Sequence, residues 1–411
     1  MPYPTLLERF LSYVRIDTQS SEQSETFPST AKQRSLALLL SDELLKLGLK
    51  DASVNPWGYV LATLETNRRK KPPTIALIAH LDTSPDVSGT DVVPCIHENY
   101  DGRDISFAGN GAMALKVDDN PYLREKIGKT IITSDGSTLL GADDKAGIAE
   151  IMATLTFFIE HPKVPRPTIR VVFTPDEETG RGVEHLTVEE IGADYGYTVD
   201  GEKVGDVDQE TFCADSMEIR IRGVNVHPGM AKNKLVNAIK IAAQIIGKLP
   251  KGKMSPETTW KREGYVHPHH VAGNVEEATI KFLIRDFADS GLKAKEVFIQ
   301  KVVDDVMSLH PKAKSDVKVI ESYRNMKLIL DQHPIVLRMA EKAVRQSGLK
   351  SRRAIIRGGT DGARLSFMGL PTPNLFTGGN NFHSKHEWIA LEDMEKAAEV
   401  LIHLLQVWAK K

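Results

Sequence analysis

Apolar residues follow two different periods along the chain, and the difference predicts two kinds of domain. Leucines at helical spacing within 30–48 predict an amphipathic helix. The continuous apolar run 74–79 predicts a strand buried on both faces. An apolar helix opening at Asp143 and a strand at 168–174 follow, and strand, helix and strand in this order imply parallel pairing. The first part of the chain therefore predicts an α/β fold with a mainly parallel sheet and helices on both faces.

The pattern changes to strict alternation from about Thr211. Residues 216–223 and 277–286 alternate apolar and polar positions, which is typical of a sheet with one solvated face. If the Pro- and His-containing stretch that ends near Gly273 holds a strand, the order with the intervening helical segments becomes β-α-β-β-α-β, which predicts a small antiparallel sheet with helices on one face. The α/β pattern resumes with a helix at 334–347. We therefore expect a discontinuous α/β domain formed by 1–210 and 326–411, with an α+β domain inserted at 211–325.

One segment of the first domain shows neither period. Residues 83–140 are rich in Asp, Gly, Pro and Asn and contain only short apolar pieces. The sequence predicts an irregular excursion there.

Composition and charge narrow the classes of function. The chain has 411 residues with 41% hydrophobic and 26% charged residues, and its net charge of −2 argues against a nucleic-acid partner. Cys95 and Cys213 are too few for a disulfide framework or a Cys-based zinc site and fit a reducing compartment. Charged residues interrupt 1–20, and no stretch approaches the roughly 20 apolar residues of a membrane span. We expect a cytoplasmic protein that does not bind membranes.

Polar residues that can bind metals follow the predicted buried strands, where open parallel sheets place their ligands. His80 and Asp82 come directly after 74–79, and residues i and i+2 of an extended chain point the same way. Asp82 could therefore orient the His80 imidazole through a hydrogen bond, without itself binding the metal. A hydrogen-bonded surface pair is the open alternative.

Three further acidic positions and one imidazole repeat this placement. Asp143 and Asp144 precede a helix, where capping is the alternative reading. Glu177 and Glu178 end the cluster Asp-Glu-Glu after the second strand, where cations would relieve the repulsion and a solvated turn is the alternative. The remaining two candidates are Asp200 and His383.

Together these side chains favour borderline-soft divalent cations such as zinc, because they mix imidazoles with carboxylates. Two cations about 3.5–4 Å apart and sharing one carboxylate would make hydroxide from water near neutral pH while a free Glu carries the proton. Other designs lack their motifs. His97-Glu98 and His386-Glu387 lack the second His of HExxH, and no GxSxG, GxxxxGK[ST] or GxGxxG opens a helix.

The ordered motifs resemble those of the di-zinc exopeptidase superfamily of carboxypeptidase G and aminoacylase. The resemblance runs along essentially the whole chain, and within the superfamily it is strongest to the tripeptide aminopeptidases. The motifs that carry it are AHLD at 79–82, GADDKAG at 141–147, PDEETGRG at 175–182, YTVDG at 197–201, NVHPG at 225–229, IRDF at 284–287, IRGGTDGA at 356–363 and FTGG at 376–379 with NFH at 381–383.

The resemblance implies a role for each metal-site residue. Asp143 would be the bridging carboxylate, His80 and Asp200 ligands of one zinc, and Glu178 and His383 ligands of the other. Glu177 would be the general base and Asp82 the orienting acid. It also implies a cis peptide bond between Asp143 and Asp144. His386 is a second candidate ligand, and we favour His383 because of its Asn-Phe-His context.

The resemblance further implies a substrate-binding set and a role for the inserted domain as a lid or dimerisation domain. His227 would stabilise the oxyanion, and a turn residue before Pro228 is the alternative. Arg285 and Arg357 could bind a terminal carboxylate through forked hydrogen bonds, with structural salt bridges as the alternative. Asn274 and Gly358 complete the expected set.

We therefore expect a zinc-dependent aminopeptidase that removes the N-terminal residue from short peptides, most often tripeptides. Cobalt or manganese could replace zinc, and the inserted domain could form a homodimer. A dipeptidase or an amidohydrolase of N-acyl amino acids is the alternative within the same chemistry. A non-catalytic peptide- or metal-binding protein is the alternative from another class. The His- and Pro-rich stretch 263–270 departs from the family pattern and bears on the peptide length that is accepted.

Overall fold

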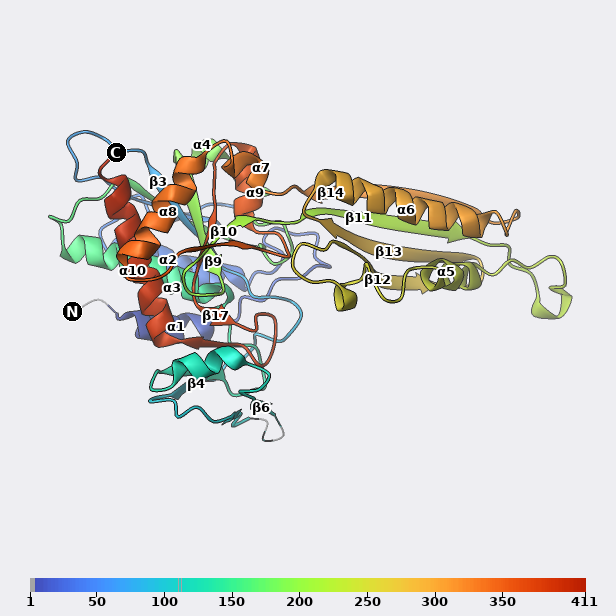
Figure 1. Ribbon diagram of the computed structural model, residues 1–411, viewed down its shortest axis with the longest axis horizontal. Helices are drawn as coiled ribbons and strands as arrows, with labels where there is room; N and C mark the ends of the chain where they lie inside the picture. Colours follow the sequence, from blue (N-terminus) through green and yellow to red (C-terminus); the bar gives the residue numbers. More distant parts are fainter. Residues whose placement is uncertain (1–3, 110, 112) are drawn as a thin grey trace. The chain divides into compact units, whose positions relative to one another are not determined.

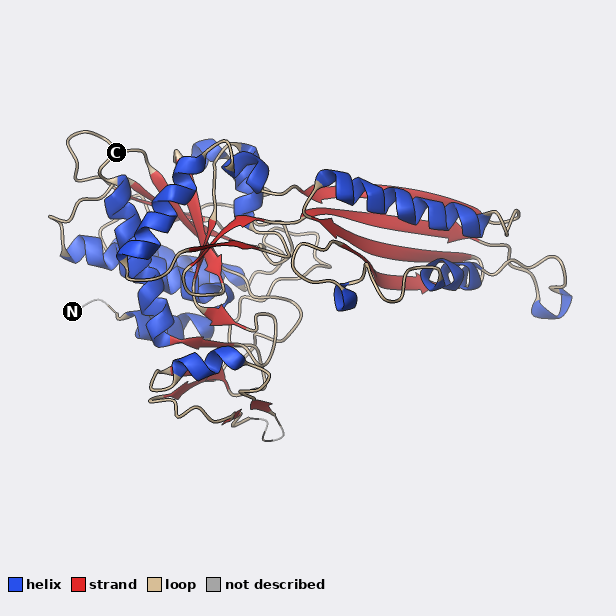
Figure 2. Ribbon diagram, in the orientation of Figure 1, coloured by secondary structure: helices blue, strands red, loops and turns tan. Residues whose placement is uncertain are grey.

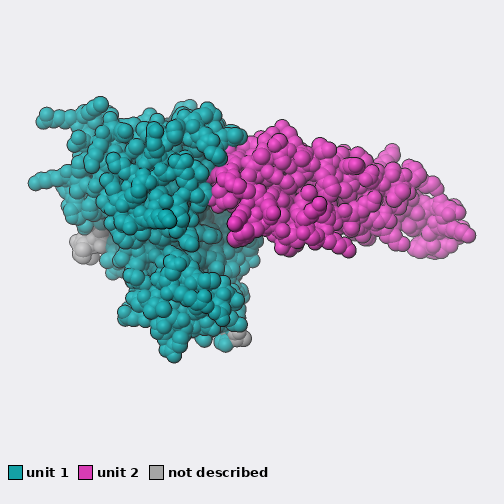
Figure 3. Space-filling model, viewed as in Figure 1, with its two compact units in different colours: residues 1–209, 326–354, 360–411 teal, residues 210–325, 355–359 magenta. Residues whose placement is uncertain are grey.

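A computed structural model describes residues 4–109, 111 and 113–411 as two compact units (Figure 3). Unit 1 comprises 1–209, 326–354 and 360–411, and unit 2 comprises 210–325 and 355–359. The short segment 355–359 belongs to unit 2 because the Ile356 N–H donates to the Glu210 carbonyl at 2.8 Å and the Phe212 N–H donates to the Gly358 carbonyl at 3.3 Å. The predicted inserted segment, 211–325, lies wholly within unit 2.

Unit 1 contains a mixed eight-stranded sheet whose centre is parallel (Figure 1). Strands β8, β3, β9 and β16 run parallel in the middle, and the pairs β1–β2, β2–β8 and β10–β16 are antiparallel. The strands in spatial order are β1 (Ser53–Val54), β2 (Val60–Leu64), β8 (Ile169–Thr174), β3 (Ile75–His80), β9 (Tyr195–Gly201), β16 (Asn374–Phe376), β10 (Asp206–Glu210) and β15 (Arg352–Ile355). All six residues of β3 are buried, as its continuous apolar sequence predicts.

Helices cover both faces of this sheet, so the predicted fold class is confirmed (Figure 2). Ala76, Ile78 and Val172 share one apolar cluster with Ile191 of α4 and Leu365 of α9. Helix α3 contacts β3 and β9, and α1 and α10 pack on α3. The helices of unit 1 are α1 (Leu6–Val14), α2 (Gln33–Lys46), α3 (Ala142–Glu160), α4 (Val188–Ile191), α7 (Lys327–Leu330), α8 (Pro334–Gln346), α9 (Asp361–Met368) and α10 (Leu391–Trp408).

The segment 83–140 is more regular than the sequence predicts. It contributes β7 and β4 to a second sheet of order β17-β18-β7-β4, while β5 and β6 pair with each other. The elements are β4 (Pro94–His97), β5 (Ile105–Ser106), β6 (Ala114–Leu115), the 3-10 helix η1 (Pro121–Lys126), β7 (Ile131–Ser134), β17 (Gly379–Asn380) and β18 (Trp388–Ala390). Trp388 completes the apolar cluster that contains Phe107 and Leu123. The expectation of an irregular excursion is wrong here: β4 pairs with β7 and β5 with β6 inside the segment, and β7 also pairs with β18, some 250 residues later in the sequence.

Unit 2 is an antiparallel four-stranded sheet of order β12-β13-β11-β14. Ile219, Ile221, Ile280 and Phe282 point to one face and share an apolar cluster with residues of both helices, including Ile241. The elements are β11 (Cys213–Arg222), η2 (Pro228–Met230), α5 (Ala238–Gly247), η3 (Pro256–Thr258), β12 (Tyr265–Gly273), β13 (Glu277–Asp286), α6 (Asp289–Met307) and β14 (Lys314–Tyr323). The predicted order β-α-β-β-α-β is confirmed.

In the described part of the chain, no helix is both long enough and apolar enough to span a membrane.

Close packing of α3 on β9 generates the first prediction. A Cβ at Gly147 would overlap the Val199 carbonyl oxygen and the Asp144 carboxylate, whereas a Cβ at Gly247, the last residue of α5, would meet nothing within 4 Å. We expect Gly147→Ala to lower the free energy of unfolding by about 1–3 kcal/mol through overpacking. Gly247→Ala should leave it unchanged or raise it. Urea unfolding of both variants checks this, and equal effects would contradict it.

Candidate metal centre

The carboxyl ends of the central parallel strands bring the predicted ligands together. His80 is the last residue of β3 and lies opposite Thr174, the last residue of β8. Ile78 pairs with Thr198 of β9, so Asp200 lies level with His80 two residues further on. The acidic turn that contains Glu178 begins directly after β8. Parallel pairing in this register therefore brings three distant sequence motifs to one edge of the sheet.

Asp143 lies at the centre of the cluster and faces an imidazole with each carboxylate oxygen. The Asp143 Oδ1 atom is 2.9 Å from the His80 Nε2 atom, and the Asp143 Oδ2 atom is 3.3 Å from the His383 Nε2 atom. The His80 Nε2 atom is 3.8 Å from an Asp200 oxygen, and the His383 Nε2 atom is 2.8 Å from a Glu178 oxygen. All five predicted ligands are therefore adjacent. The peptide bond between Asp143 and Asp144 is cis.

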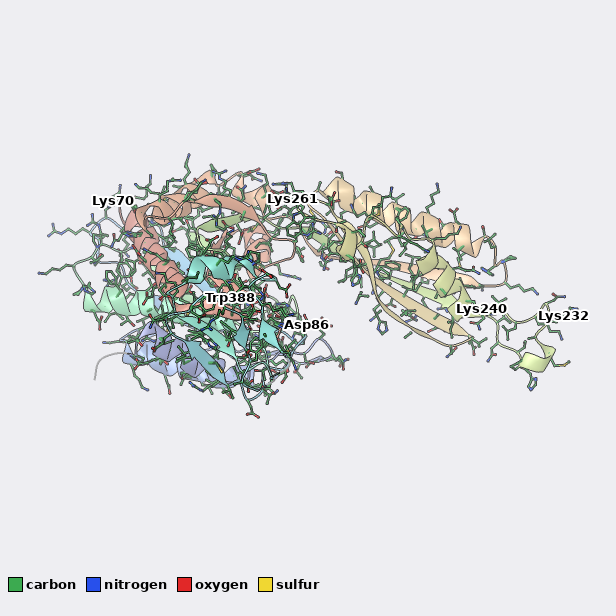
Figure 4. The ribbon with its side chains drawn as sticks, turned by 60° about the horizontal axis from the view of Figure 1, so that its bottom comes forward. Lys70, Asp86, Lys232, Lys240, Lys261 and Trp388 are labelled. Atoms are coloured by element: carbon green, nitrogen blue, oxygen red, sulfur yellow. The ribbon has the colours of Figure 1, made fainter. Side chains whose placement is uncertain are left out.

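Each imidazole turns its other nitrogen toward an aspartate. The His80 Nδ1 atom is 3.0 Å from the Asp82 carbonyl oxygen and 3.4 Å from the Asp82 carboxylate. The His383 Nδ1 atom is 3.3 Å from the Asp86 carboxylate, and Asp86 is labelled in Figure 4. In the metal-free protein each Nε2 atom donates to the Asp143 carboxylate. Donation from Nδ1 fixes the ring orientation, so that Nε2 would face a cation once its proton is lost, which is the arrangement of histidines that bind metals. Asp86 was not among the predicted residues, because nothing in the sequence around it indicates that it would contact His383.

Crowding of carboxylates changes how they titrate. Burial raises the pKa of Glu178 to about 8 and that of Asp200 to about 7, and the nearby Asp143 charge adds to both shifts. Burial acts against ionisation of Asp143 as well, but hydrogen bonds from His383 and His80 outweigh it and lower the Asp143 pKa. The buried Oε1 atom of Glu178 has no hydrogen-bond partner among the described residues, so it is available to a ligand that the structure does not contain.

The turn that contains Glu177 and Glu178 is held from two directions. Fully buried Asp82 accepts hydrogen bonds from the N–H groups of Glu177 at 3.0 Å and Glu178 at 3.2 Å. Asp176 has a left-handed backbone conformation, with φ of 59°. Its carboxylate accepts hydrogen bonds from the Ser29 N–H and hydroxyl and from the Gln33 amide. The N-terminal segment therefore fixes a strained residue directly before Glu177.

Asp144 is a second acid that could occupy the central position of the cluster. His80, Asp144 and Asp200 together satisfy the distances of a three-residue metal site, as do His80, Asp143 and Glu178. One Asp144 oxygen, however, already accepts the His80 backbone N–H at 3.0 Å. Burial and the Asp200 charge raise the Asp144 pKa well above its ordinary value. We therefore regard Asp143, which faces both imidazoles, as the central carboxylate.

His386, the alternative to His383, points elsewhere. Its ring packs edge-on against Phe107 at 5.6 Å between centroids, and its backbone N–H donates to the Ser384 hydroxyl. The His383 side chain is 40% exposed, whereas Asp82 is fully buried. The cluster therefore opens to solvent on the His383 side.

The predicted catalytic residue His227 and the predicted substrate-binding residues lie in unit 2. The His227 Nδ1 atom accepts a hydrogen bond from the Gly229 N–H at 3.2 Å, which places the proton of the neutral imidazole on Nε2. Arg357 donates to the carbonyl oxygens of Lys261 at 2.6 Å and Glu263 at 2.9 Å. Arg285 uses one terminal nitrogen, Nη1, for the carbonyls of Asp215 and Ile284.

Two smaller members of the predicted set also lie in unit 2. The Asn274 side-chain oxygen accepts the N–H groups of Glu276 and Glu277, so Asn274 shapes the turn between β12 and β13. Gly358 is loosely surrounded, because a Cβ added there would contact Ile356 alone, at 3.8 Å.

Fold and site together define the class of the protein, a peptidase of the M20/M25/M40 family, whose sequence model matches residues 139–407. The chain is 47% identical over 406 residues to peptidase T of Clostridium botulinum (strain 657 / Type Ba4), covering 99% of both chains. The chain therefore belongs to the peptidase T family, and the predicted hydrolase activity and family resemblance are confirmed.

Solved structures agree with this fold. The aminopeptidase PepT of Bacillus cereus ATCC 10987 has a TM-score of 0.74 and 24% identity, covering 98% of both chains. A tripeptidase of Staphylococcus aureus subsp. aureus Mu50 has a TM-score of 0.76 and 23% identity, covering 99% of this chain and 98% of the other.

Proposed function

We propose that the protein is an aminopeptidase that releases the N-terminal residue of tripeptides with the help of two divalent cations, with zinc as the expected metal. The observation that carries the proposal is the position of Asp143, whose two oxygens face His80 and His383 on opposite sides. A carboxylate with an imidazole on each side is the arrangement expected of a bridging ligand. The similarity to an aminopeptidase and to a tripeptidase supports the choice of substrate.

The residues present fit a pair of cations. His80, Asp143 and Asp200 would bind one, and Asp143, Glu178 and His383 would bind the other. Imidazole nitrogen and carboxylate oxygen are the donor types that zinc accepts, and cobalt or manganese can use the same set. Two cations would also supply the partner that the buried Glu178 Oε1 atom does not find among the described residues. When bound, they would acidify water and polarise the substrate carbonyl.

Protein side chains would handle the proton and the developing charge. Glu177 would accept a proton from the attacking water and deliver it to the departing amine, because it lies beside the ligand Glu178 and burial raises its pKa above the ordinary value. The Glu177 backbone is held by Asp82, which would also orient His80. His227 would donate a hydrogen bond from Nε2 to the oxyanion, and this donor is consistent with Nδ1 acting as an acceptor.

Arg285, rather than Arg357, would bind the C-terminal carboxylate of the peptide. The Arg357 guanidinium donates to four backbone or side-chain groups of the 259–263 loop, including the Thr259 hydroxyl at 3.0 Å. Arg285 commits one nitrogen to backbone carbonyls, which leaves a forked pair of donors for a carboxylate. We therefore propose Arg357 as a residue that shapes the substrate-binding loop. Asn274 and Gly358 would act through the turns that contain them.

A panel of small substrates, combined with metal analysis, tests the proposal. With two equivalents of zinc bound per chain, we expect tripeptides to be cleaved at the first bond much faster than dipeptides or N-acetyl amino acids. A tripeptide with a C-terminal carboxamide should show a raised KM, because Arg285 loses its charged partner. Preferential cleavage of dipeptides or N-acetyl amino acids would instead support the alternative reactions. Stoichiometric peptide binding without hydrolysis would support a non-catalytic binding protein.

Glu177 provides the second prediction for this function. We expect Glu177→Ala to lower kcat by 10²–10⁴-fold, the usual contribution of a general base, while two metals remain bound. Glu184→Ala is the matched control, because this exposed glutamate pairs with Arg181 outside the cluster and its loss should not alter kcat. Steady-state kinetics and metal analysis of both variants make the measurement. More than about a tenth of wild-type kcat in Glu177→Ala would rule out the general-base role.

We also propose that unit 2 joins two copies of the chain into a homodimer. Strand β14 is the last strand of its sheet, and Val319 and Ile320 on it are each 44% exposed. An edge strand with exposed apolar residues favours pairing with a second strand. Analytical ultracentrifugation should give the mass of two chains, and Val319→Lys should shift it toward one. A single-chain mass for the wild type at micromolar concentration would contradict the proposal.

The cytoplasm is the compartment that we propose. Cys95 and Cys213 are both free, and Cys213 is buried, as expected for a protein kept in a reducing environment. Recovery of the protein from the culture medium rather than from the cell fraction would contradict this.

A further inference from the structure

Glu387 is a buried acid that none of the proposed catalytic steps uses. Its side chain is 1% exposed, and it lies between β17 and β18, four residues after His383. The carboxylate accepts three backbone hydrogen bonds. The Oε2 atom accepts from Leu140 at 2.8 Å and Gly141 at 2.7 Å, and the Oε1 atom accepts from Asp143 at 3.0 Å. Both oxygens are therefore used to hold one short segment of backbone.

That segment begins helix α3 and includes the proposed bridging ligand. Gly141 precedes the helix in a left-handed conformation and offers no side chain to cap it. Asp143 has a non-helical backbone, with φ of −84° and ψ of 103°. The N–H groups at a helix N-terminus lack intrahelical partners, and a carboxylate satisfies them well because of the helix dipole. Glu387 thus supplies the cap that local sequence does not.

The same residue belongs to the loop that contains His383. The backbone from 383 to 387 is short and includes a turn in which the Glu387 N–H donates to the Ser384 carbonyl at 3.2 Å. Glu387 therefore connects two ligand-bearing segments that are about 240 residues apart in sequence. It is bound directly to the backbone of Asp143, and it is fixed to His383 by one turn of chain.

We propose that Glu387 is a positioning residue that sets the separation of Asp143 and His383 and thereby the affinity of the site for its second cation. This inference rests on the proposed two-metal function. The contacts give it a direct physical basis, since the 3.3 Å between the Asp143 Oδ2 and His383 Nε2 atoms depends on two backbones that Glu387 joins. Outer residues that orient metal ligands typically change metal affinity by 10–100-fold when replaced.

The decisive variant is Glu387→Gln, which keeps the size of the side chain but turns an amide NH₂ toward one of the N–H groups. We expect metal affinity, measured by competition with a chromophoric chelator, to fall 10–100-fold. We expect kcat at limiting metal to fall while KM for the tripeptide stays within about twofold. In the metal-free protein, the amides of residues 140, 141 and 143 should exchange hydrogen at least tenfold faster.

Glu392→Gln is the matched control. Glu392 lies five residues further on, and both its oxygens accept the Thr130 N–H, at 3.1 and 3.2 Å, away from the ligands. Its replacement should leave metal affinity and exchange at 140–143 unchanged. If Glu387→Gln does not fold, Glu387→Asp, which retains the charge but is one methylene shorter, is measured in the same way.

The outcomes separate this inference from the proposed function. A wild-type protein that binds no divalent cation would refute the two-metal function. A wild-type protein that binds two cations, together with a folded Glu387 variant of unchanged metal affinity, would refute the positioning role alone. Equal loss of metal affinity in the Glu387 and Glu392 variants would also refute it, because general destabilisation would then explain both.

Discussion

Repulsion among carboxylates gathered at the ends of strands β8 and β9 and at the start of helix α3 is the constraint on which the rest of the structure depends. Asp143, Glu178 and Asp200 meet within a few ångströms of one another, and burial raises the pKa of two of them to about 7 or 8. Such a group of charges is stable only with compensating positive charge or hydrogen-bond donors. The two imidazoles provide part of this compensation, and the proposed cations would provide the remainder.

Around this cluster, backbone N–H groups are paired with acids that are not themselves proposed ligands. Asp82 accepts two N–H groups of the Glu177 turn, Asp176 accepts the Ser29 N–H of the N-terminal segment, and Glu387 accepts three N–H groups at the start of helix α3. Each pairing satisfies a buried acid and fixes a loop at the same time. The geometry of the proposed ligands therefore depends on surrounding carboxylates that accept hydrogen bonds from the backbone of the ligand-bearing loops.

The residues with proposed roles occur in both units. Unit 1 contains the proposed metal ligands and the general base, while unit 2 contains His227 and the arginines considered for substrate binding. Within unit 2, hydrogen bonding distinguishes the two arginines, because Arg357 is committed to its own loop and Arg285 keeps donors available. The sequence motifs IRDF and IRGG do not reveal this difference, because it depends on side-chain contacts in the folded protein.

Sequence alone determined the class of fold and the identity of the candidate site. Period-two and period-3.6 patterns are local, and they identified β3, the order β-α-β-β-α-β and the polar residues after each strand. Tertiary structure decided what depends on distant partners. The small sheet needs β18 to pair with β7, Asp86 acts on a histidine about 300 residues away, and Glu387 caps a helix that begins about 240 residues earlier. No local pattern records such contacts, because a hydrogen bond across the fold requires proximity in space and leaves the spacing of residues along the chain unconstrained.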